Sequence, residues 1–272
     1  MAIKVDSNGT KQWALRDTET QLKNWAKWFI GTAAFMYCWQ KISAETDWDF
    51  FWDAPRIAAD IGGRAVPPKF SYITELWWPL WDTLNIATLG TILALAMAIP
   101  IAFLAARNTT PDRFILRPLA LLVIVSSRSI NSLIWALLLV AIIGPGVFAG
   151  LIAIALRSIG FCAKLLYEAI EEIDENQVEA VTATGASRWQ VMAFAIVPQI
   201  MPALAGITVF RWDINIREST VLGLVGAGGI GLQMQASMNV LAWPQVSLIL
   251  GVILIAVLIS EWVSAKVRGA II

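Results

Sequence analysis

Long apolar stretches alternate with shorter polar segments along most of this chain of 272 residues. A helix needs about 20 mostly apolar residues to cross the hydrocarbon core of a bilayer, and it satisfies its own backbone hydrogen bonds there. The pattern therefore predicts an all-α integral membrane protein with about six transmembrane helices. The predicted spans cover residues 25–39, 84–106, 118–143, 147–162, 191–210 and 246–263.

The segments on either side of the first span have distinct compositions. Residues 1–24 are polar, whereas residues 43–83 are rich in tryptophan, proline and acidic side chains. Tryptophan rings favour the headgroup layer, so we expect residues 43–83 to form an interfacial segment, with ordinary loop tryptophans as the alternative. The predicted organisation is an N-terminal segment, a first span with the tryptophan-rich segment, a transmembrane core and a tail, at residues 1–24, 25–83, 84–265 and 266–272.

Lysine and arginine are distributed unevenly over the segments between the predicted spans. Short cytoplasmic loops of membrane proteins carry an excess of these residues. The bias favours a cytoplasmic N-terminus, and an even number of spans returns the C-terminus to the same side. In this topology the polar, helical-looking stretch at residues 164–190 is also cytoplasmic.

The composition excludes several kinds of binding and catalytic site. Hydrophobic residues make up 58% of the chain, charged residues 15%, and the mean hydropathy is +0.67. The formal net charge is zero, so nothing indicates attraction to nucleic acid. The sequence contains no histidine, which excludes histidine-based catalysis and histidine metal sites, and we expect no metal on this chain.

A cytoplasmic stretch carries a recognisable motif. Residues 179–202 read EAVTATGASRWQVMAFAIVPQIMP, which resembles the coupling motif of ABC importer permeases: Glu-Ala-Ala, three residues, Gly, nine residues, Ile, one residue and Leu-Pro. Three small apolar substitutions depart from that pattern. The positions that match it are Glu179, Ala180, Gly185 and Pro198.

The resemblance implies that a coupling helix within about residues 164–190 docks onto a separate ATPase. No Walker sequence G-x-x-x-x-G-K-[ST] occurs in the chain, so ATP and Mg²⁺ are expected on that partner and no cofactor on this one. Gly185 permits a tight bend there. The alternative is an ordinary amphipathic cytoplasmic helix.

A glycine-rich segment, GAGGIG at residues 226–231, matches the dinucleotide fingerprint G-x-G-x-x-G. No βαβ pattern surrounds it and no acidic residue follows about 20 positions on, so that function is excluded. We expect a bend between helical pieces, in which glycines permit close backbone approach. The bend or gate glycines are Gly226, Gly228, Gly229 and Gly231.

The larger block at residues 210–231, FRWDINIRESTVLGLVGAGGIG, is similar to the phosphonate-class permeases, with further likeness at residues 127–131 and 164–173. This resemblance implies a type I ABC importer fold in a bacterial inner membrane. It also implies a transport subunit, without enzymatic activity, for phosphonate or a related reduced phosphorus oxyanion such as phosphite. The implied partners are a second copy of the chain, two ABC ATPases and a periplasmic phosphonate- or phosphite-binding protein.

Three alternatives remain open from the sequence. A methionine-type ABC permease shares the coupling motif and a glycine-rich segment. An ion-driven secondary transporter would need no ATPase, but the inverted repeat common in that class is not visible. A membrane-embedded enzyme lacks a recognisable catalytic set.

Charged residues inside predicted spans are costly and usually face a pathway or a partner. Arg128 lies within the third span, and helical spacing places Asn131, Ser132 and Trp135 on its face. Arginine can donate two parallel hydrogen bonds to an oxyanion, so Arg128 is either a pathway residue or the partner of a carboxylate such as Glu218 or Asp213. We expect Arg157 to be structural and Asp213 to pair with Arg217 on one helix. The full set of candidate pathway residues is Ser127, Arg128, Asn131, Arg211, Asn215, Arg217 and Glu218.

Overall fold

The computed structural model describes residues 2–5, 9, 11–14 and 18–271. The chain divides into two units, Met1–Gly62 and Gly63–Ile272. Parts of the predicted N-terminal segment and the last residue of the predicted tail lie outside the described residues.

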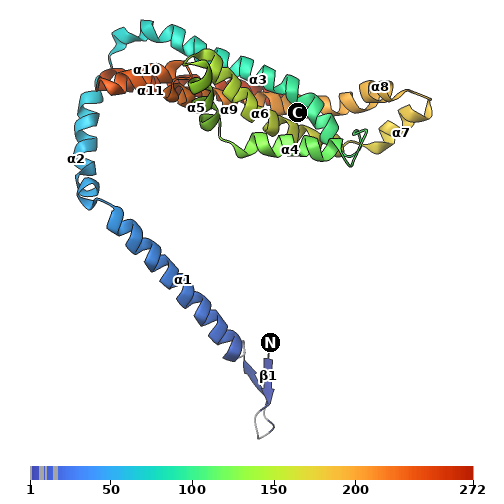
Figure 1. Cartoon of the computed structure of the whole chain (residues 1–272), viewed down its shortest axis with the longest axis horizontal. Helices are drawn as coiled ribbons and strands as arrows, with labels where there is room; N and C mark the ends of the chain where they lie inside the picture. Colours follow the sequence, from blue (N-terminus) through green and yellow to red (C-terminus); the bar gives the residue numbers. More distant parts are fainter. Residues whose placement is uncertain (1, 6–8, 10, 15–17, 272) are drawn as a thin grey trace. The chain divides into compact units, whose positions relative to one another are not determined.

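The first unit begins with a short strand pair followed by helices (Figure 1). β1 (Ala2–Val5) pairs antiparallel with β2 (Lys11–Ala14), an element that the hydrophobic pattern does not predict. α1 (Thr18–Glu45) contains the first predicted span. α2 (Trp48–Ala65) follows and occupies much of the tryptophan-rich segment.

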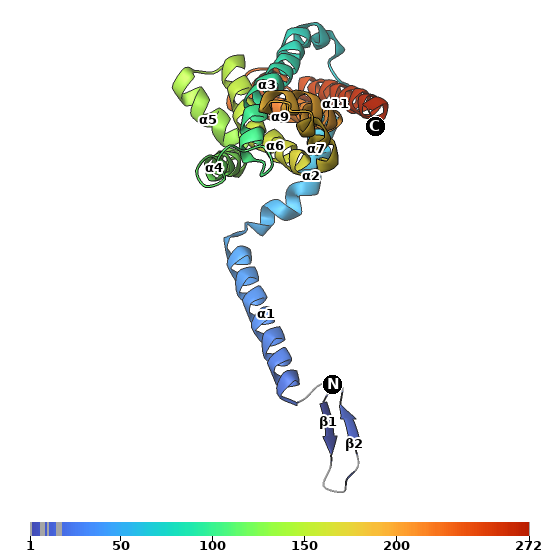
Figure 2. The same ribbon diagram turned by 90° about the vertical axis from the view of Figure 1, so that its right-hand side faces the viewer.

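The second unit is helical. Figure 2 shows α4 and α5 to one side of α3, α6 and α9, and α11 to the other. The elements are η1 (Phe70–Leu76), α3 (Trp77–Ala105), α4 (Leu116–Ser129), α5 (Ser132–Ile143), α6 (Val147–Glu171), α7 (Glu175–Ala183), α8 (Arg188–Val191), the π-helical turn η2 (Met192–Ile196), α9 (Val197–Leu222), η3 (Gly223–Val225), α10 (Ile230–Asn239) and α11 (Trp243–Ile271).

Small side chains hold the centre of this unit together. On α3, Ala94, Ala98 and Ala102 are buried, and they pack with Ala155 and Ala163 of α6 in shared apolar clusters. Apolar side chains gain no hydrophobic free energy when they move from lipid to a contact with another helix. Helix association in membranes therefore depends on close packing of the backbones, which small residues allow. The α3–α6 pair is therefore the core on which the other helices pack.

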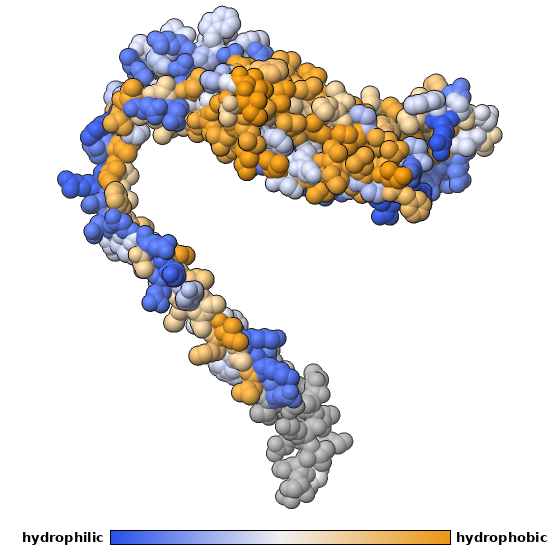
Figure 3. All heavy atoms as spheres, in the orientation of Figure 1, coloured by the Kyte–Doolittle hydropathy of each residue, from blue (hydrophilic) through white to orange (hydrophobic). Residues whose placement is uncertain are grey.

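The membrane-crossing segments are close in number to the prediction. In the described part of the chain, four helical segments are long and apolar enough to cross a bilayer: Phe70–Ala105, Val147–Glu171, Arg188–Asn239 and Trp243–Ala270. The bent pair α4 and α5 makes a fifth if it counts as one span. α1 does not meet this criterion. Hydrophobic residues cover much of the face of the second unit seen in Figure 3, as a lipid-facing surface requires.

The third predicted span is not one helix. α4 ends at Ser129 and α5 begins at Ser132, with an angle of 87° between them. Asn131 lies between the two in an extended conformation, and its side chain accepts a hydrogen bond from the backbone N–H of Leu133 at 3.2 Å. Asparagine is among the strongest N-cap residues, so it starts a new helix at this point. We call residues 127–132 the elbow.

Two other predicted spans end too early in the sequence. α6 continues through Glu171, so the first part of the predicted coupling stretch 164–190 belongs to a long helix. α9 continues to Leu222, beyond the predicted end of the fifth span at residue 210. Both extensions carry charged residues that form ion pairs within the helical unit. The helices can therefore continue past the point at which the apolar run ends.

Gly160 provides a test of the close contact between α4 and α6. A Cβ atom on Gly160 would lie 2.5 Å from the carbonyl oxygen of Ile124. We expect Gly160→Ala to lower the thermal midpoint of the purified protein, since forced overpacking typically costs about 1–3 kcal/mol. Gly206→Ala is the control, because nothing lies within 4 Å of its added Cβ. Equal midpoints for both variants would contradict this account of the crossing.

Candidate functional site

A chain of buried polar side chains crosses three helices. Arg211 of α9 donates from Nε to Ser158 Oγ of α6 at 2.9 Å, and Ser158 donates to Asn215 Oδ1 at 3.2 Å. Asn215 donates from Nδ2 to Thr91 Oγ1 of α3 at 2.7 Å. All four side chains are almost fully buried. Buried polar groups that are satisfied in this way fix one arrangement of the helices that carry them.

A carboxylate lies between two arginines beside this chain. Glu218 Oε2 is 3.4 Å from Arg211 Nη2, and Glu218 Oε1 is 3.3 Å from Arg157 Nε. Arg211 also stacks on Phe161, with 5.1 Å from its guanidinium carbon to the ring centroid. The spacing of Arg211, Asn215 and Glu218 on one helix is as predicted. Arg157, expected to be structural, pairs with Glu218 in this cluster, and it is half-buried where Arg211 is fully buried.

A second ion pair lies on another side of α9. Arg217 Nη2 contacts Asp213 Oδ2, which confirms the predicted pair at i, i+4. Asp213 also accepts a hydrogen bond from Ser260 Oγ of α11 at 2.8 Å. Arg217 is thus directed to the α11 side and is not joined to Arg211 and Glu218, as the helical spacing of these residues predicted.

The elbow places Arg128 at the surface of the chain. The predicted helical face that joins Arg128 to Asn131, Ser132 and Trp135 does not exist, because α4 ends at Ser129. Among the described residues, no hydrogen bond or ion pair is found for the Arg128 side chain, which is exposed. Glu218 and Asp213 are paired with other arginines, so the alternative partners considered for Arg128 are also wrong.

Ser127 fixes the elbow against α6. Its Oγ accepts a hydrogen bond from the backbone N–H of Gly160 at 2.9 Å and contacts the carbonyl oxygens of Leu156 and Arg157. Arg128, the next residue, and Arg157 therefore flank the same helix crossing. In the cluster itself, Arg157 and Arg211 contribute +2 and Glu218 −1, a net charge of +1.

The glycine-rich segment forms the expected bend between α9 and α10. Gly226, Gly228 and Gly229 have positive φ angles of +86°, +82° and +75°, which side chains with a Cβ rarely adopt. Gly226 O accepts a hydrogen bond from Gly146 N at 3.0 Å, in the turn between α5 and α6. A Cβ on Gly231 would lie 2.0 Å from the carbonyl oxygen of Thr220. In this chain the segment is packed between helices, and its role as a gate stays a prediction.

The coupling motif lies at one end of the second unit, where α7 and α8 extend from the other helices (Figure 1). Glu179 and Ala180 are exposed on α7, and Gly185 has a φ of +81° in the turn after it, as the predicted bend requires. Ser187 and Gln190 form a capping box that starts α8. Pro198 lies apart from these residues, at the start of α9.

One exposed aromatic residue was missed by the sequence analysis. Trp189 on α8 has 78% of its surface exposed. Figure 3 shows that this end of the unit is less hydrophobic than its middle. A large exposed ring on a polar surface is typical of a protein contact, and its position within the motif could have indicated this.

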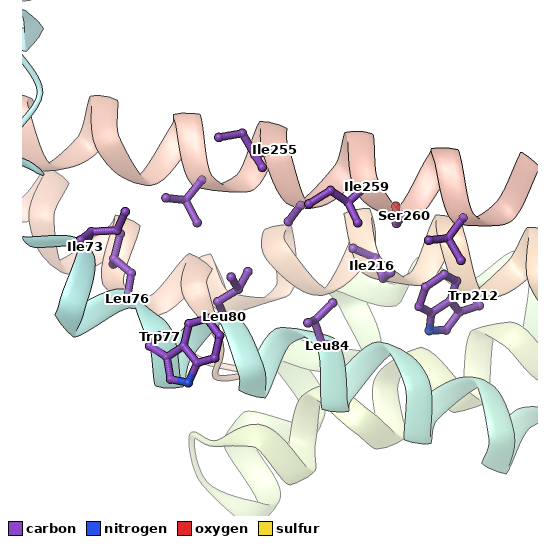
Figure 4. A pocket seen from close by; sticks show the side chains of 13 residues that line it. Ile73, Leu76, Trp77, Leu80, Leu84, Trp212, Ile216, Ile255, Ile259 and Ser260 are labelled. Atoms are coloured by element: carbon purple, nitrogen blue, oxygen red, sulfur yellow. The ribbon is translucent and has the colours of Figure 1, made fainter. Parts of the chain in front are cut away.

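An apolar pocket of about 450 Å³ lies between α3, α9 and α11 (Figure 4). It is lined almost entirely by aliphatic and tryptophan side chains. Its one hydroxyl, that of Ser260, is already bonded to Asp213. The indole N–H of Trp212 is likewise bonded, to Thr88 Oγ1 at 3.0 Å. No charged side chain lines this pocket, and the arginine cluster lies elsewhere.

Comparisons with known proteins show which families this chain resembles. Residues 98–265 match the family described as "Binding-protein-dependent transport system inner membrane component". The chain is 39% identical over 210 residues to the phosphite transport system permease protein PtxC of Stutzerimonas stutzeri, covering 77% of this chain and 76% of that protein. It is 37% identical over 224 residues to the phosphate-import permease protein PhnE of Mycolicibacterium smegmatis, covering 82% of this chain and 42% of that protein.

Solved structures show the same fold. The permease in inward-facing structures of the MetNI methionine ABC transporter aligns with a TM-score of 0.62 at 19% identity, over 72% of this chain and 96% of that one. A bacterial ABC transporter involved in the import of alginate aligns with a TM-score of 0.56 at 17% identity, over 90% of this chain and 99% of that one. The all-α, type I importer fold expected from the sequence is therefore confirmed.

Glu218→Gln tests the arginine cluster. The change keeps the shape of the side chain but leaves Arg211, whose side chain is 2% exposed, without its carboxylate. Removing one partner of a buried ion pair typically costs about 3–5 kcal/mol, so we expect the thermal midpoint of the purified protein to fall clearly. Glu168→Gln is the control, since its pair with Lys164 is exposed and such pairs contribute about 0–1 kcal/mol. A midpoint unchanged by Glu218→Gln would show that Glu218 does not stabilise the cluster.

Proposed function

Because the chain belongs to the family of binding-protein-dependent transport system inner membrane components, we propose that it is the membrane permease of an ATP-driven importer for phosphonate or a related reduced phosphorus oxyanion such as phosphite. The observation that carries the substrate class is the 39% identity, over three quarters of both chains, to a permease of a phosphite transport system. A second phosphite permease of the same organism, putative HtxC, is 35% identical over 206 residues.

The other functions considered have less support. A methionine transport permease of Pasteurella multocida is 28% identical over only 55% of this chain. Family membership argues against an ion-driven secondary transporter and against an enzyme. Hydrolysis of ATP, with its Mg²⁺, is assigned here to partner chains.

The proposed assembly contains two copies of this chain, two ATPases on the cytoplasmic side and a binding protein for the oxyanion on the outer side. Both termini and the α7–α8 end are cytoplasmic in this arrangement. The bias of lysine and arginine toward these segments supports that orientation. Two copies related by a two-fold axis would enclose one pathway between them.

Arginines at the elbow are the proposed contacts for the passing anion. A charged side chain at membrane depth costs at least about 2.5 kcal/mol on insertion scales, so an arginine with no protein partner needs another role. Arg128 has no such partner in the part of the chain that the structure describes, and Arg157 retains donors beyond its contact with Glu218. A guanidinium presents parallel donors to two oxygens of a phosphorus oxyanion. The excess positive charge near the α4–α6 crossing supports an anionic cargo.

α9 provides a mechanical link from the coupling motif to Arg211 and to Glu218, which contacts Arg157. The helix begins next to η2 and α8, carries Arg211 and Glu218 in its second half, and ends at the glycine-rich bend. A displacement of the α7–α8 end by an ATPase would therefore be transmitted along one continuous helix. The contact of α7 with η2 joins the two parts.

Uptake by the reconstituted transporter tests the function and the role of Arg128. The chain is co-expressed with its ATPase and binding protein, and ATP-dependent uptake of phosphite, methylphosphonate, phosphate and methionine is measured in vesicles. We expect uptake of a phosphorus oxyanion but not of methionine. Arg128→Gln should reduce that uptake at least several-fold while ATP hydrolysis and assembly persist, whereas Arg113→Gln, in an exposed cytoplasmic loop, should not. Methionine uptake would refute the substrate class, and full activity of Arg128→Gln would refute its role in the pathway.

Gly185→Val tests coupling. A β-branched residue at a φ of +81° is strained, and a left-handed conformation costs about 1–2 kcal/mol for residues with a Cβ. We expect the turn between α7 and α8 to rearrange, so that uptake is lost while the chain still inserts into the membrane. Gly269→Val is the control, at a glycine near the end of α11 with open space around it and no positive φ. Undiminished uptake by Gly185→Val would rule out a role for this turn in coupling.

A further inference from the structure

α2 separates charged from apolar side chains with unusual completeness. Successive residues of a helix are rotated by about 100°. On this spacing, every charged residue of α2 falls within an arc of about 80°. Three aspartates and two arginines contribute −3 and +2, a net charge of −1. These residues are Asp49, Asp53, Arg56, Asp60 and Arg64.

The remainder of the helix surface is apolar and uncovered. Trp52 has 75% of its surface exposed, Phe50 71% and Phe51 60%. No residue of α2 is buried. Phe51 contacts both Trp48 and Trp52 edge to face, with ring centroids 5.9 and 5.7 Å apart. Figure 3 shows hydrophilic atoms along one side of α2 and hydrophobic atoms along the other.

The C-terminal end of α2 is tied to the ends of two membrane-crossing segments. Ser247 Oγ donates a hydrogen bond to the carbonyl oxygen of Ala65 at 2.7 Å, and Lys69 N donates to Pro244 O at 3.0 Å. One membrane-crossing segment begins at Phe70 and another at Trp243. Five residues span at most about 18 Å, so the end of α2 lies within that distance of the start of the first segment, and the two hydrogen bonds hold it beside the start of the second.

We propose that α2 lies parallel to the membrane, at the surface that faces away from the cytoplasm. Its apolar arc is inserted at the boundary of headgroups and acyl chains, and its charged arc is in water. A wide apolar face rich in tryptophan and phenylalanine, opposite a narrow charged face, is the pattern of an interfacial helix. Because the net charge of α2 is −1, anionic lipid does not attract it, and burial of the aromatic side chains drives the binding. The occupant of this face is therefore lipid of either charge, and the hydrogen bonds at Ala65 and Lys69 make the helix an anchor for the outer ends of α3 and α11.

Spin labels on two faces of α2 test this arrangement in the full-length protein. Single cysteines replace Ala54, Ala58 and Ala65, which share an arc of about 40° in the apolar face and span about 16 Å along the axis. Asp53→Cys is the control in the charged arc. The natural thiols are first removed by Cys38→Ser and Cys162→Ala. Collision rates with oxygen, which partitions into lipid, and with a water-soluble nickel chelate are compared in phosphatidylcholine vesicles with and without phosphatidylglycerol.

Labels at the three alanine positions should collide with oxygen several-fold more often, relative to the nickel chelate, than the label at position 53. They should also report one common depth, in both lipid mixtures. Shielding of the alanine positions from both reagents would mean that a second copy or another protein covers this face, and would overturn the proposal. So would access to the nickel chelate, a depth that changes steadily from position 54 to 65, or insertion only with phosphatidylglycerol.

Discussion

The high cost of an unpaired charge inside a bilayer governs how this chain is built. Its longest apolar segment contains two arginines, an aspartate and a glutamate in the second half of α9. Each of them finds an oppositely charged partner, and the most deeply buried, Arg211, is also held by a serine of α6 and by an aromatic ring. These requirements fix the rotation of α9 about its axis. The side chains that contact α6 occupy one face of α9, and the side chain that contacts α11 lies on another.

Close contact between helix backbones is the second condition for this fold, and the pairing of the buried charged and polar side chains depends on it. A serine hydroxyl is short, so Ser158 can reach Arg211 and Asn215 only where α6 and α9 approach closely. Glycines and alanines on α3 and α6 allow such distances throughout the core. The elbow follows the same rule: Ser127 reaches the backbone of α6 because Gly160 has no side chain in the way. Packing and charge pairing thus stabilise one arrangement together.

Residues on one helix could be placed from the sequence, whereas contacts between helices could not. The Asp213–Arg217 pair and the alignment of Arg211 with Glu218 follow from the helical repeat alone. The contact between Arg157 and Glu218 joins α6 to α9, and no spacing within either helix reveals it. The elbow was missed because a single N-cap, Asn131, outweighed an otherwise continuous apolar run. The bend after α9 was predicted correctly, since clustered glycines act through local backbone geometry.

The π-helical turn η2 has a consequence for how such chains can diverge. A π turn completes its rotation with about one residue more than an α-helical turn, whereas each residue of an α-helix adds about 100°. Loss of one residue between Met192 and Ile196 would therefore return this turn to α-helix and leave Arg211 and Glu218 directed toward α6. Loss of one residue from the α-helical part of α9 before Arg211 would instead turn both side chains away from α6 by about 100°. The π turn is thus the place at which this long helix can change its length by one residue without separating the arginine cluster from α6.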